Sequence, residues 1–132
     1  MTRIFIDGKA GTTGLKIFSR FQNRPELELI QIDEDKRKDT EERRKFLNAA
    51  DLVFLCLPDE AAREAVAMID NPNTRVIDAS TAHRTAEGWV YGFAELLPGQ
   101  RQRIKFASRV ANPGCHATGF ISIVYPLVGM GI

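Results

Sequence analysis

The stretch NPGC, Asn112–Cys115, contains a thiol that could act as a nucleophile. The Pro-Gly pair predicts a turn, and the mainly apolar run after it predicts a helix that begins at Cys115. The free N–H groups of a helix N-terminus favour a thiolate over a thiol, and they could also stabilise an oxyanion formed in acyl transfer. This setting predicts covalent catalysis through Cys115, although the cysteine taken alone is equally compatible with an ordinary structural thiol.

The second cysteine, Cys56, lies inside the unbroken apolar run VFLCLP, and we interpret it as a small buried hydrophobic residue. Two cysteines do not form a dense disulfide framework, and no Cys/His spacing in the chain is typical of a zinc site. We therefore predict no metal and a reducing compartment, the cytoplasm.

A glycine-rich segment near the N-terminus, DGKAGTTG, lies between a strand-like run and a helical pattern, as a dinucleotide-binding turn requires. In such a turn the first glycine permits a tight bend, the second lets the backbone approach a pyrophosphate, and the third lets helix and strand pack closely. The N–H groups at the start of the helix would face the anion. The expected cofactor contacts here are Gly8, Gly11, Thr12, Thr13 and Gly14. The alternative is a glycine-built turn that binds no nucleotide.

The residues after the second predicted strand affect the choice between NAD and NADP. Asp33 ends that strand about 20 residues after the glycine turn, where an acidic side chain binds the ribose hydroxyls of NAD. Lys36, Arg37 and Lys38 follow, and these could neutralise the 2′-phosphate of NADP or form a solvated connection. The residues themselves leave both cofactors open.

Strands and helices alternate along the chain in a way that can position these groups. Apolar runs predict strands at residues 3–7, 27–33, 51–58 and 74–80, and a last strand and turn at 104–114. Helical patterns are predicted at residues 13–21, at 59–69 with Asp59 as N-cap, and from Cys115, while the charged segment 33–45 is predicted to be an exposed connection. Pro58, at the end of the third strand, is expected to contact the cofactor. The alternation favours an α/β fold with a doubly wound, Rossmann-like, mostly parallel sheet and helices on both faces.

A long polar and aromatic loop, residues 82–101, follows the fourth predicted strand, and such loops are often functional or carry short elements of their own. Arg84 in this loop could bind a carboxylate or phosphate of a substrate, or be an ordinary surface arginine. Asn112 could orient a substrate, although capping of the next helix is the commoner role. We interpret His83 as a structural or loop residue. His116 adjoins Cys115, but neighbouring helical residues point about 100° apart, so we do not expect it to act as a base for the thiol.

NPGC, together with GKAGTTG and VYGFAEL (Val90–Leu96), resembles the N-acetyl-gamma-glutamyl-phosphate reductases. DASTAHRT and GCHATGF resemble the shorter bacterial form, and the resemblance runs over most of the 132 residues. NPGCHATG departs from the NPGCYPT of the longer form, which concerns the subgroup more than the chemistry. Aspartate-semialdehyde dehydrogenases use a similar cysteine-based chemistry, but their cysteine motif is NxNC. The glycine before Cys115 therefore favours the reductase.

The resemblance implies an NADP-dependent oxidoreductase of arginine biosynthesis that converts N-acetyl-glutamyl 5-phosphate to N-acetyl-glutamate 5-semialdehyde. Cys115 would attack the acyl phosphate, phosphate would leave, and hydride from the nicotinamide would reduce the thioester. NADP would use the basic residues, including Lys36 and Arg37, as phosphate contacts, which makes Asp33 a discrepancy. The resemblance also implies a homo-oligomer in the full-length form, and a histidine as general acid/base in a second, substrate-binding domain.

We therefore expect residues 1–114 to form a dinucleotide-binding domain and residues 115–132 to begin a substrate and dimerisation domain. The chain would be either a fragment or a short protein that has lost turnover, and alone it is not expected to be competent. The alternatives are a noncatalytic NAD(P)-binding module, an aspartate-semialdehyde dehydrogenase-like enzyme, and a Rossmann-like domain that binds no nucleotide. A net charge of +1 gives no reason to expect nucleic acid or a membrane as partner, and no apolar run approaches a membrane span.

Overall fold

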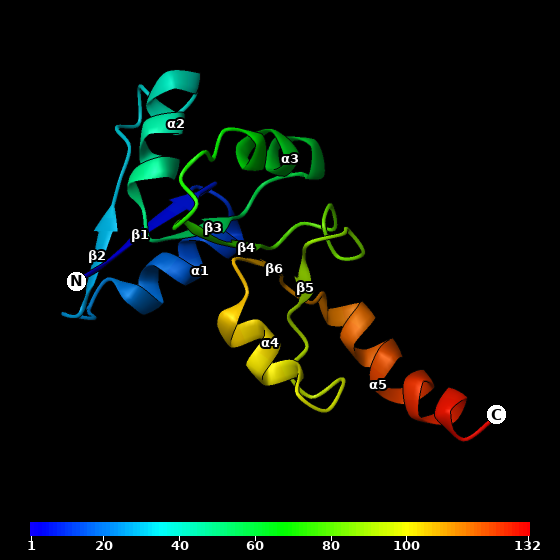
Figure 1. Cartoon of the computed structure of the whole chain (residues 1–132). Helices are drawn as coiled ribbons and strands as arrows, with labels where there is room; N and C mark the ends of the chain where they lie inside the picture. The colour runs from blue at the N-terminus through cyan, green and yellow to red at the C-terminus, as the bar shows by residue number, and fades with distance from the viewer.

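The apolar runs of the sequence form one parallel sheet in the computed structural model, which describes all 132 residues (Figure 1). The strands are β1 (Thr2–Asp7), β2 (Leu27–Ile30), β3 (Leu52–Leu55), β4 (Arg75–Asp78), β5 (Val90–Tyr91) and β6 (Arg109–Ala111). The helices are α1 (Thr12–Phe21), α2 (Thr40–Ala49), α3 (Asp59–Ala67), α4 (Gln100–Phe106) and α5 (Cys115–Gly129). The predicted α/β, doubly wound architecture is confirmed, and every strand pair is parallel.

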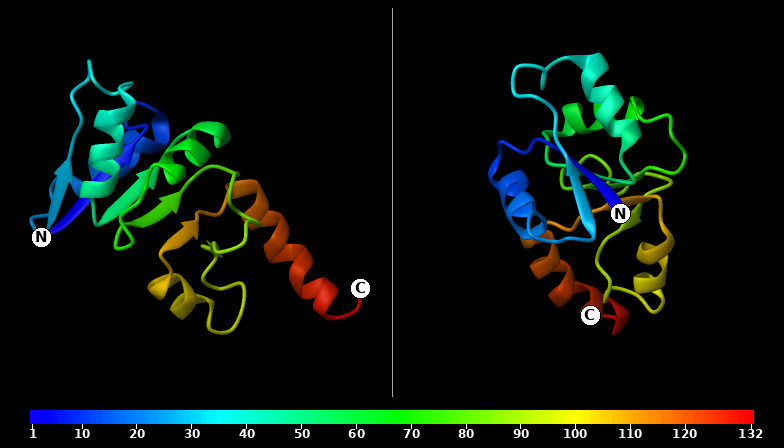
Figure 2. Two further views of the ribbon diagram at one scale, coloured as in Figure 1. Left: turned by 45° about the horizontal axis from the view of Figure 1, so that its top comes forward. Right: turned by 90° about the vertical axis from the view of Figure 1, so that its left-hand side faces the viewer.

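The strand order β2-β1-β3-β4-β6-β5 places the reversal of chain direction across the sheet between β1 and β3. Helix α1 lies on one face of the sheet, and α2 and α3 lie on the opposite face (Figures 1 and 2). In open parallel sheets, ligands bind beyond the carboxyl ends of the strands at such a switch point. The topology therefore indicates a ligand site at the turn after β1.

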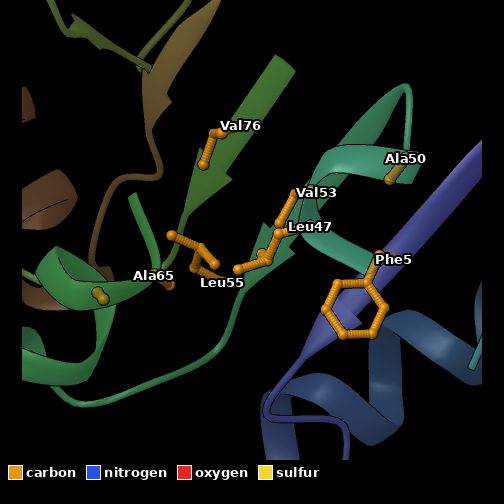
Figure 3. Packing of buried hydrophobic residues seen from close by; sticks show 8 residues of the cluster. Phe5, Leu47, Ala50, Val53, Leu55, Ala65 and Val76 are labelled. Atoms are coloured by element: carbon orange, nitrogen blue, oxygen red, sulfur yellow. The ribbon is translucent and has the colours of Figure 1, made fainter. Parts of the chain in front are cut away.

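The core lies between the central strands and the helices α2 and α3. Phe5, Val53 and Val76 are paired across β1, β3 and β4, so their side chains share one face of the sheet, and each is at most 2% exposed. Leu47 of α2 packs into the same cluster (Figure 3). On the other face, Phe54 meets Phe21 of α1 with ring centroids 5.6 Å apart. Burial of each large apolar side chain contributes about 1.5–3 kcal/mol, so this cluster fixes the strands that carry the site.

Helix α2 corrects the prediction that residues 33–45 are only an exposed connection. Asp39 caps the helix by accepting a hydrogen bond from the N–H of Glu42 at 3.0 Å, and Leu47 is fully buried. The error has a physical origin, since α2 buries a narrow stripe near its C-terminal end while charged residues cover the rest of its surface.

The last predicted strand is also corrected, because residues 104–106 belong to helix α4 and only Arg109–Ala111 form β6. The Arg75 side chain donates to the carbonyl oxygens of Lys105 and Ala107, each at 3.0 Å, and so satisfies groups at the end of α4. The long loop after β4 does carry an element of its own, β5.

Helix α5 extends away from the sheet and ends near the C-terminus (Figure 2). None of its residues is buried. No helix in the structure combines the length and the apolar character needed to cross a bilayer.

Candidate cofactor and thiol site

The glycine turn has two positions where only glycine fits. Gly8 has a φ of +86°, and a Cβ built on it would lie 2.2 Å from the carbonyl oxygen of Cys56 on the neighbouring strand segment. A Cβ on Gly14 would lie 2.4 Å from the carbonyl oxygen of Gly8. Gly11 differs, because its Cβ would meet only that same oxygen at an ordinary 3.5 Å. The first and third glycines thus build the turn, and the second leaves open space beside the backbone.

The start of helix α1 presents unpaired N–H groups to that space. Leu15 is the first residue to close a helical hydrogen bond, to the carbonyl oxygen of Gly11 at 2.9 Å, so the N–H groups of Thr12, Thr13 and Gly14 have no helical acceptor. A cavity of about 220 Å³ lies there. Its lining consists of Gly11, Thr12, Thr13, Cys56, Leu57 and Ala79. This arrangement can hold an anion such as a pyrophosphate.

A larger cleft of about 630 Å³ adjoins the same turn, between the ends of β1 and β2 and the segment before α2. Its apolar lining includes Ile30, Ile32 and Leu57. Its charged lining residues are Asp7, Lys9, Glu34, Arg37, Lys38 and Arg43. The lining therefore combines apolar surface for a flat ring with an excess of positive charge for a phosphate.

The structure separates the predicted cofactor contacts into two groups. Arg37 lines the large cleft together with Lys38. Asp33 and Lys36 do not line it. Both side chains are exposed, and Lys36 Nζ lies 3.9 Å from Asp33 Oδ2.

Pro58 also lies outside the lining of both cavities and occupies the N-cap position of α3. This corrects the prediction that Asp59 caps the helix. The Asp59 carboxylate instead accepts hydrogen bonds from the N–H and the hydroxyl of Thr81, at 3.0 and 2.6 Å, and the hydroxyl bond in particular lowers the pKa of Asp59.

Sequence reasoning missed Lys9, Arg43 and Asp7. Arg43 Nη2 lies 2.7 Å from Asp7 Oδ2, and both side chains are largely buried, at 16% and 10% exposure. The Lys9 ammonium lies 3.7 Å from the ring centroid of Phe18 and donates to Gln31. The available signal was the acidic Asp7 at the end of a buried strand, because a buried carboxylate requires a cationic partner.

Cys115 is the first residue of α5 and is exposed. Thr118 is the first residue of this helix to donate a helical hydrogen bond, to Gly114 at 2.9 Å, so the preceding N–H groups remain free. The Arg84 guanidinium lies against Gly114, since a Cβ built on that glycine would be 2.7 Å from Nη2 and 2.8 Å from Nη1. The structure thus brings the guanidinium against the residue before Cys115, at the helix start where the amides are free.

The expected capping role of Asn112 is wrong, because Gly114 is the N-cap and the Asn112 amide donates to the carbonyl of Pro113 at 3.2 Å. His116 is exposed beside the thiol, whereas His83 is buried in the loop after β4. No three or more His, Cys, Asp or Glu side chains are grouped so that they could hold a metal ion.

Cys56 is half-buried, beside the small cavity. Burial raises the pKa of its thiol to about 11, and the carboxylates of Asp7 and Asp78 add to the shift. The sequence indicates a small buried hydrophobic residue at Cys56; in the structure Cys56 is only half-buried and lines the cavity, and its raised pKa predicts low reactivity.

Comparison with known proteins identifies the family of the chain. The family model "Semialdehyde dehydrogenase, NAD binding domain" matches residues 3–105. Over 98% of its length, the chain is 56% identical to N-acetyl-gamma-glutamyl-phosphate reductase 2 of Nostoc sp., covering 40% of that protein, and 55% identical to the enzyme of the same name in Pseudomonas putida, covering 41%. The chain thus spans about two fifths of the curated relatives it matches.

Among solved structures, aspartate semialdehyde dehydrogenase II of Vibrio cholerae superposes with a TM-score of 0.64 at 16% identity, over 98% of this chain and 43% of that one. The Candida albicans aspartate semialdehyde dehydrogenase solved with NADP gives 0.60 at 14% identity, over 98% of this chain and 47% of that one. At these identities the likeness establishes the fold alone.

Proposed function

Since this chain belongs to the semialdehyde dehydrogenase family through its NAD-binding domain, we propose that it is the cofactor-binding part of an N-acetyl-gamma-glutamyl-phosphate reductase. The substrate would be N-acetyl-glutamyl 5-phosphate, and the products N-acetyl-glutamate 5-semialdehyde and phosphate. A bound NADPH would supply the hydride. Such an enzyme would belong to cytoplasmic arginine biosynthesis.

One observation carries the proposal. The terminal residues Asp7, Leu55, Asp78 and Ala111 of β1, β3, β4 and β6 are in register across the sheet. The glycine turn follows the first of these strands, and the cysteine turn follows the last. With neighbouring strands about 4.8 Å apart, the two turns are separated by roughly 14 Å along one edge of the sheet. This spacing supports a dinucleotide that runs from one turn to the other.

We propose that the pyrophosphate lies at the start of α1, on the free N–H groups of residues 12–14 and beside Gly11. The open side of Gly11 supports this placement, because no protein atom crowds a Cβ position there. Gly8 and Gly14 would shape the turn, and the adenosine would occupy the 630 Å³ cleft. Pro58 would affect cofactor binding only through its position at the start of α3.

The charge of the large cleft favours NADP. Lys9, Arg37 and Lys38 line it, and Arg43 adds a fourth cation. The charge of Arg43 is offset by Asp7, and Arg37 Nη1 lies 3.3 Å from Glu34 Oε2. Asp33, which alone would favour NAD, is exposed and paired with Lys36 instead. The proposed phosphate contacts are therefore Arg37 and Lys38, with Lys36 outside the cleft.

Cys115 is proposed to be the nucleophile. Its thiolate would form a bond to the acyl carbon as the carbon–oxygen bond to phosphate breaks, and the resulting thioester would accept hydride and release the aldehyde and the thiolate. The free amides of α5 would stabilise the developing oxyanion. Arg84, against Gly114, would bind an anionic group of the substrate, and the exposed Asn112 would help to orient it.

We further propose the division into a dinucleotide-binding domain, residues 1–114, and the beginning of a substrate and dimerisation domain, residues 115–132. Support comes from the apolar surface of α5, where Phe120, Ile123 and Val128 are each more than 60% exposed. In the full-length reductase that surface would be covered by the remainder of the second domain. That remainder would supply the histidine general acid/base and subunit contacts.

Two measurements on the chain test the proposal. Titration with NADPH and NADH, followed by nicotinamide fluorescence, should show preferential binding of NADPH. The double variant Arg37→Gln/Lys38→Gln should reduce this preference by about tenfold or more, because two charge-assisted contacts are lost, while the control Lys36→Gln should leave it unchanged. No binding of either nucleotide would contradict a cofactor role.

The second measurement isolates the acyl-transfer step. The chain is incubated with acetyl phosphate, and acylation is located by mass spectrometry of its peptides. We expect a hydroxylamine-sensitive thioester on Cys115 and none on Cys56. Nucleotide binding without acylation would instead indicate a noncatalytic module.

A further inference from the structure

The loop after β4 contains a buried acid–histidine pair that the proposed chemistry does not use. Asp78 is fully buried at the end of β4, and its Oδ2 lies 2.6 Å from Nδ1 of His83. The same carboxylate accepts hydrogen bonds from the N–H and the hydroxyl of Ser80, at 3.0 and 2.7 Å. Trp89 stacks on the His83 ring at a centroid separation of 4.0 Å and an angle of 13°. These contacts fold residues 78–83 into a fixed turn.

The turn is also tied to the elements on both sides of it. Thr81 is held by Asp59 at the start of α3. The carbonyl of Asp78 accepts a hydrogen bond at 2.8 Å from the N–H of Asn112, in the turn that leads to Cys115. The backbone around His83 is therefore fixed relative to the start of α5.

The next residue, Arg84, has no comparable anchor of its own. Its Nε is buried without a hydrogen-bond partner, and its guanidinium is placed by packing against Gly114. A long arginine side chain has many rotamers. Because no hydrogen bond of its own fixes the Arg84 side chain, the guanidinium stays against Gly114 only while the backbone of Arg84 is held in place. The backbone position of Arg84 is set by His83, the residue before it, which is bonded to the buried Asp78.

We propose that Asp78 and His83, covered by Trp89, form a positioning element that holds the Arg84 guanidinium against the N-terminus of α5. Arg84 then contributes positive charge beside Cys115, and its N–H groups remain available for an anion. His83 acts through Arg84, so it is a positioning residue. The inference rests on the proposed function only in taking Cys115 as the reacting thiol.

The test uses the charge of the alkylating reagent. Cys115 in the 132-residue chain is labelled with iodoacetate, which is an anion, and with iodoacetamide, which is neutral, and the ratio of the two rates is compared among variants. The ratio responds to nearby charge and is insensitive to the general reactivity of the thiol. Labelling of Cys56 and far-UV circular dichroism report whether each variant is folded.

Arg84→Gln should lower the ratio by about threefold or more, because a positive charge near the thiol is lost. His83→Ala should lower it by a similar factor although Arg84 is present, and should have no further effect in the Arg84→Gln background. His83→Gln, whose amide can donate to Asp78, should restore part of the ratio. The control Arg101→Gln removes an exposed arginine paired with Glu95 and should change nothing.

An unchanged ratio in folded His83→Ala, with a lowered ratio in Arg84→Gln, would overturn the positioning role and leave the proposed function intact. An unchanged ratio in Arg84→Gln would overturn it as well, since Arg84 would then not act on Cys115. If His83→Ala does not fold, Trp89→Ala decides, provided that it folds, because it removes the stacked cover while His83 and Asp78 stay in place. A lowered ratio then supports the role, and an unchanged ratio overturns it. A wild-type Cys115 that matches free cysteine with both reagents would count against the nucleophile itself.

Discussion

The two cysteines are expected to differ strongly in reactivity. Burial and neighbouring carboxylates raise the pKa of Cys56 from 9.0 to about 11. Below both values the thiolate fraction falls tenfold for each unit of pKa, so Cys56 should carry about a hundredfold less thiolate than an ordinary thiol near pH 8. Cys115 is exposed at a helix start, with no such burial. We therefore expect Cys115 to react at least about a hundredfold faster with iodoacetamide.

The assay is timed alkylation followed by peptide mass spectrometry, with Cys56→Ser and Cys115→Ser as single-thiol controls. Because only the thiolate reacts, the rate at Cys56 should rise steadily from pH 8 and be half-maximal at about pH 11, where its thiol is half ionised. Comparable rates for the two cysteines near neutral pH would refute this reasoning. A Cys56 rate that is half-maximal near pH 9, as for a thiol with the ordinary pKa of 9.0, would show that burial does not raise its pKa.

Further predictions address the turn, the core and alkaline stability. Gly11→Ala should leave the urea midpoint nearly unchanged but weaken NADPH binding, whereas Gly14→Ala should lower the midpoint because its Cβ would collide with backbone 2.4 Å away. Leu47→Ala should destabilise the fold by about 2–5 kcal/mol in urea unfolding, a loss too large for a solvated connection. Gly114→Ala has an allowed backbone conformation but displaces Arg84, so the iodoacetate-to-iodoacetamide ratio at the thiol should fall while the melting temperature changes little. Between about pH 9 and 11 the unfolded chain loses the Cys56 proton and the folded chain keeps it, so stability should fall as pH rises through this window, and less steeply in Cys56→Ser.

Much of the fold is predictable because its signals are local. A buried parallel strand is a short apolar run, and the turn after β1 requires glycine wherever a Cβ would meet backbone. Cys115 begins α5 as expected, since a Pro-Gly turn precedes a long run of helix-compatible residues. The charged helix α2 was missed because its buried stripe is narrow and its N-cap, Asp39, lies in a series of charged residues that also suits a solvated loop.

The site was less predictable because its decisive contacts join distant parts of the chain. Arg43 reaches Asp7 from a helix 36 residues later. Arg84 meets Gly114, although nothing in the sequence near either residue indicates the other. Asp33 was expected to contact the ribose because β2 was predicted to run three residues longer than it does. In each case the residue type was informative, and the direction of the side chain required the tertiary structure.

The register of the strands explains how one edge of the sheet can carry both the proposed cofactor turn and Cys115, the proposed nucleophile. Gly8, Cys56, Ala79 and Asn112 each follow a strand that ends at the same level. A dinucleotide that runs from the glycine turn to Cys115 must therefore pass the ends of β3 and β4, where Cys56 and Ala79 line the small cavity. Small side chains are required there for space, and a thiol on that path must be unreactive to avoid competing with Cys115. The raised pKa of Cys56 meets the second condition, so the burial of Cys56 leaves the proposed nucleophile, Cys115 at the start of α5, without a competing thiol.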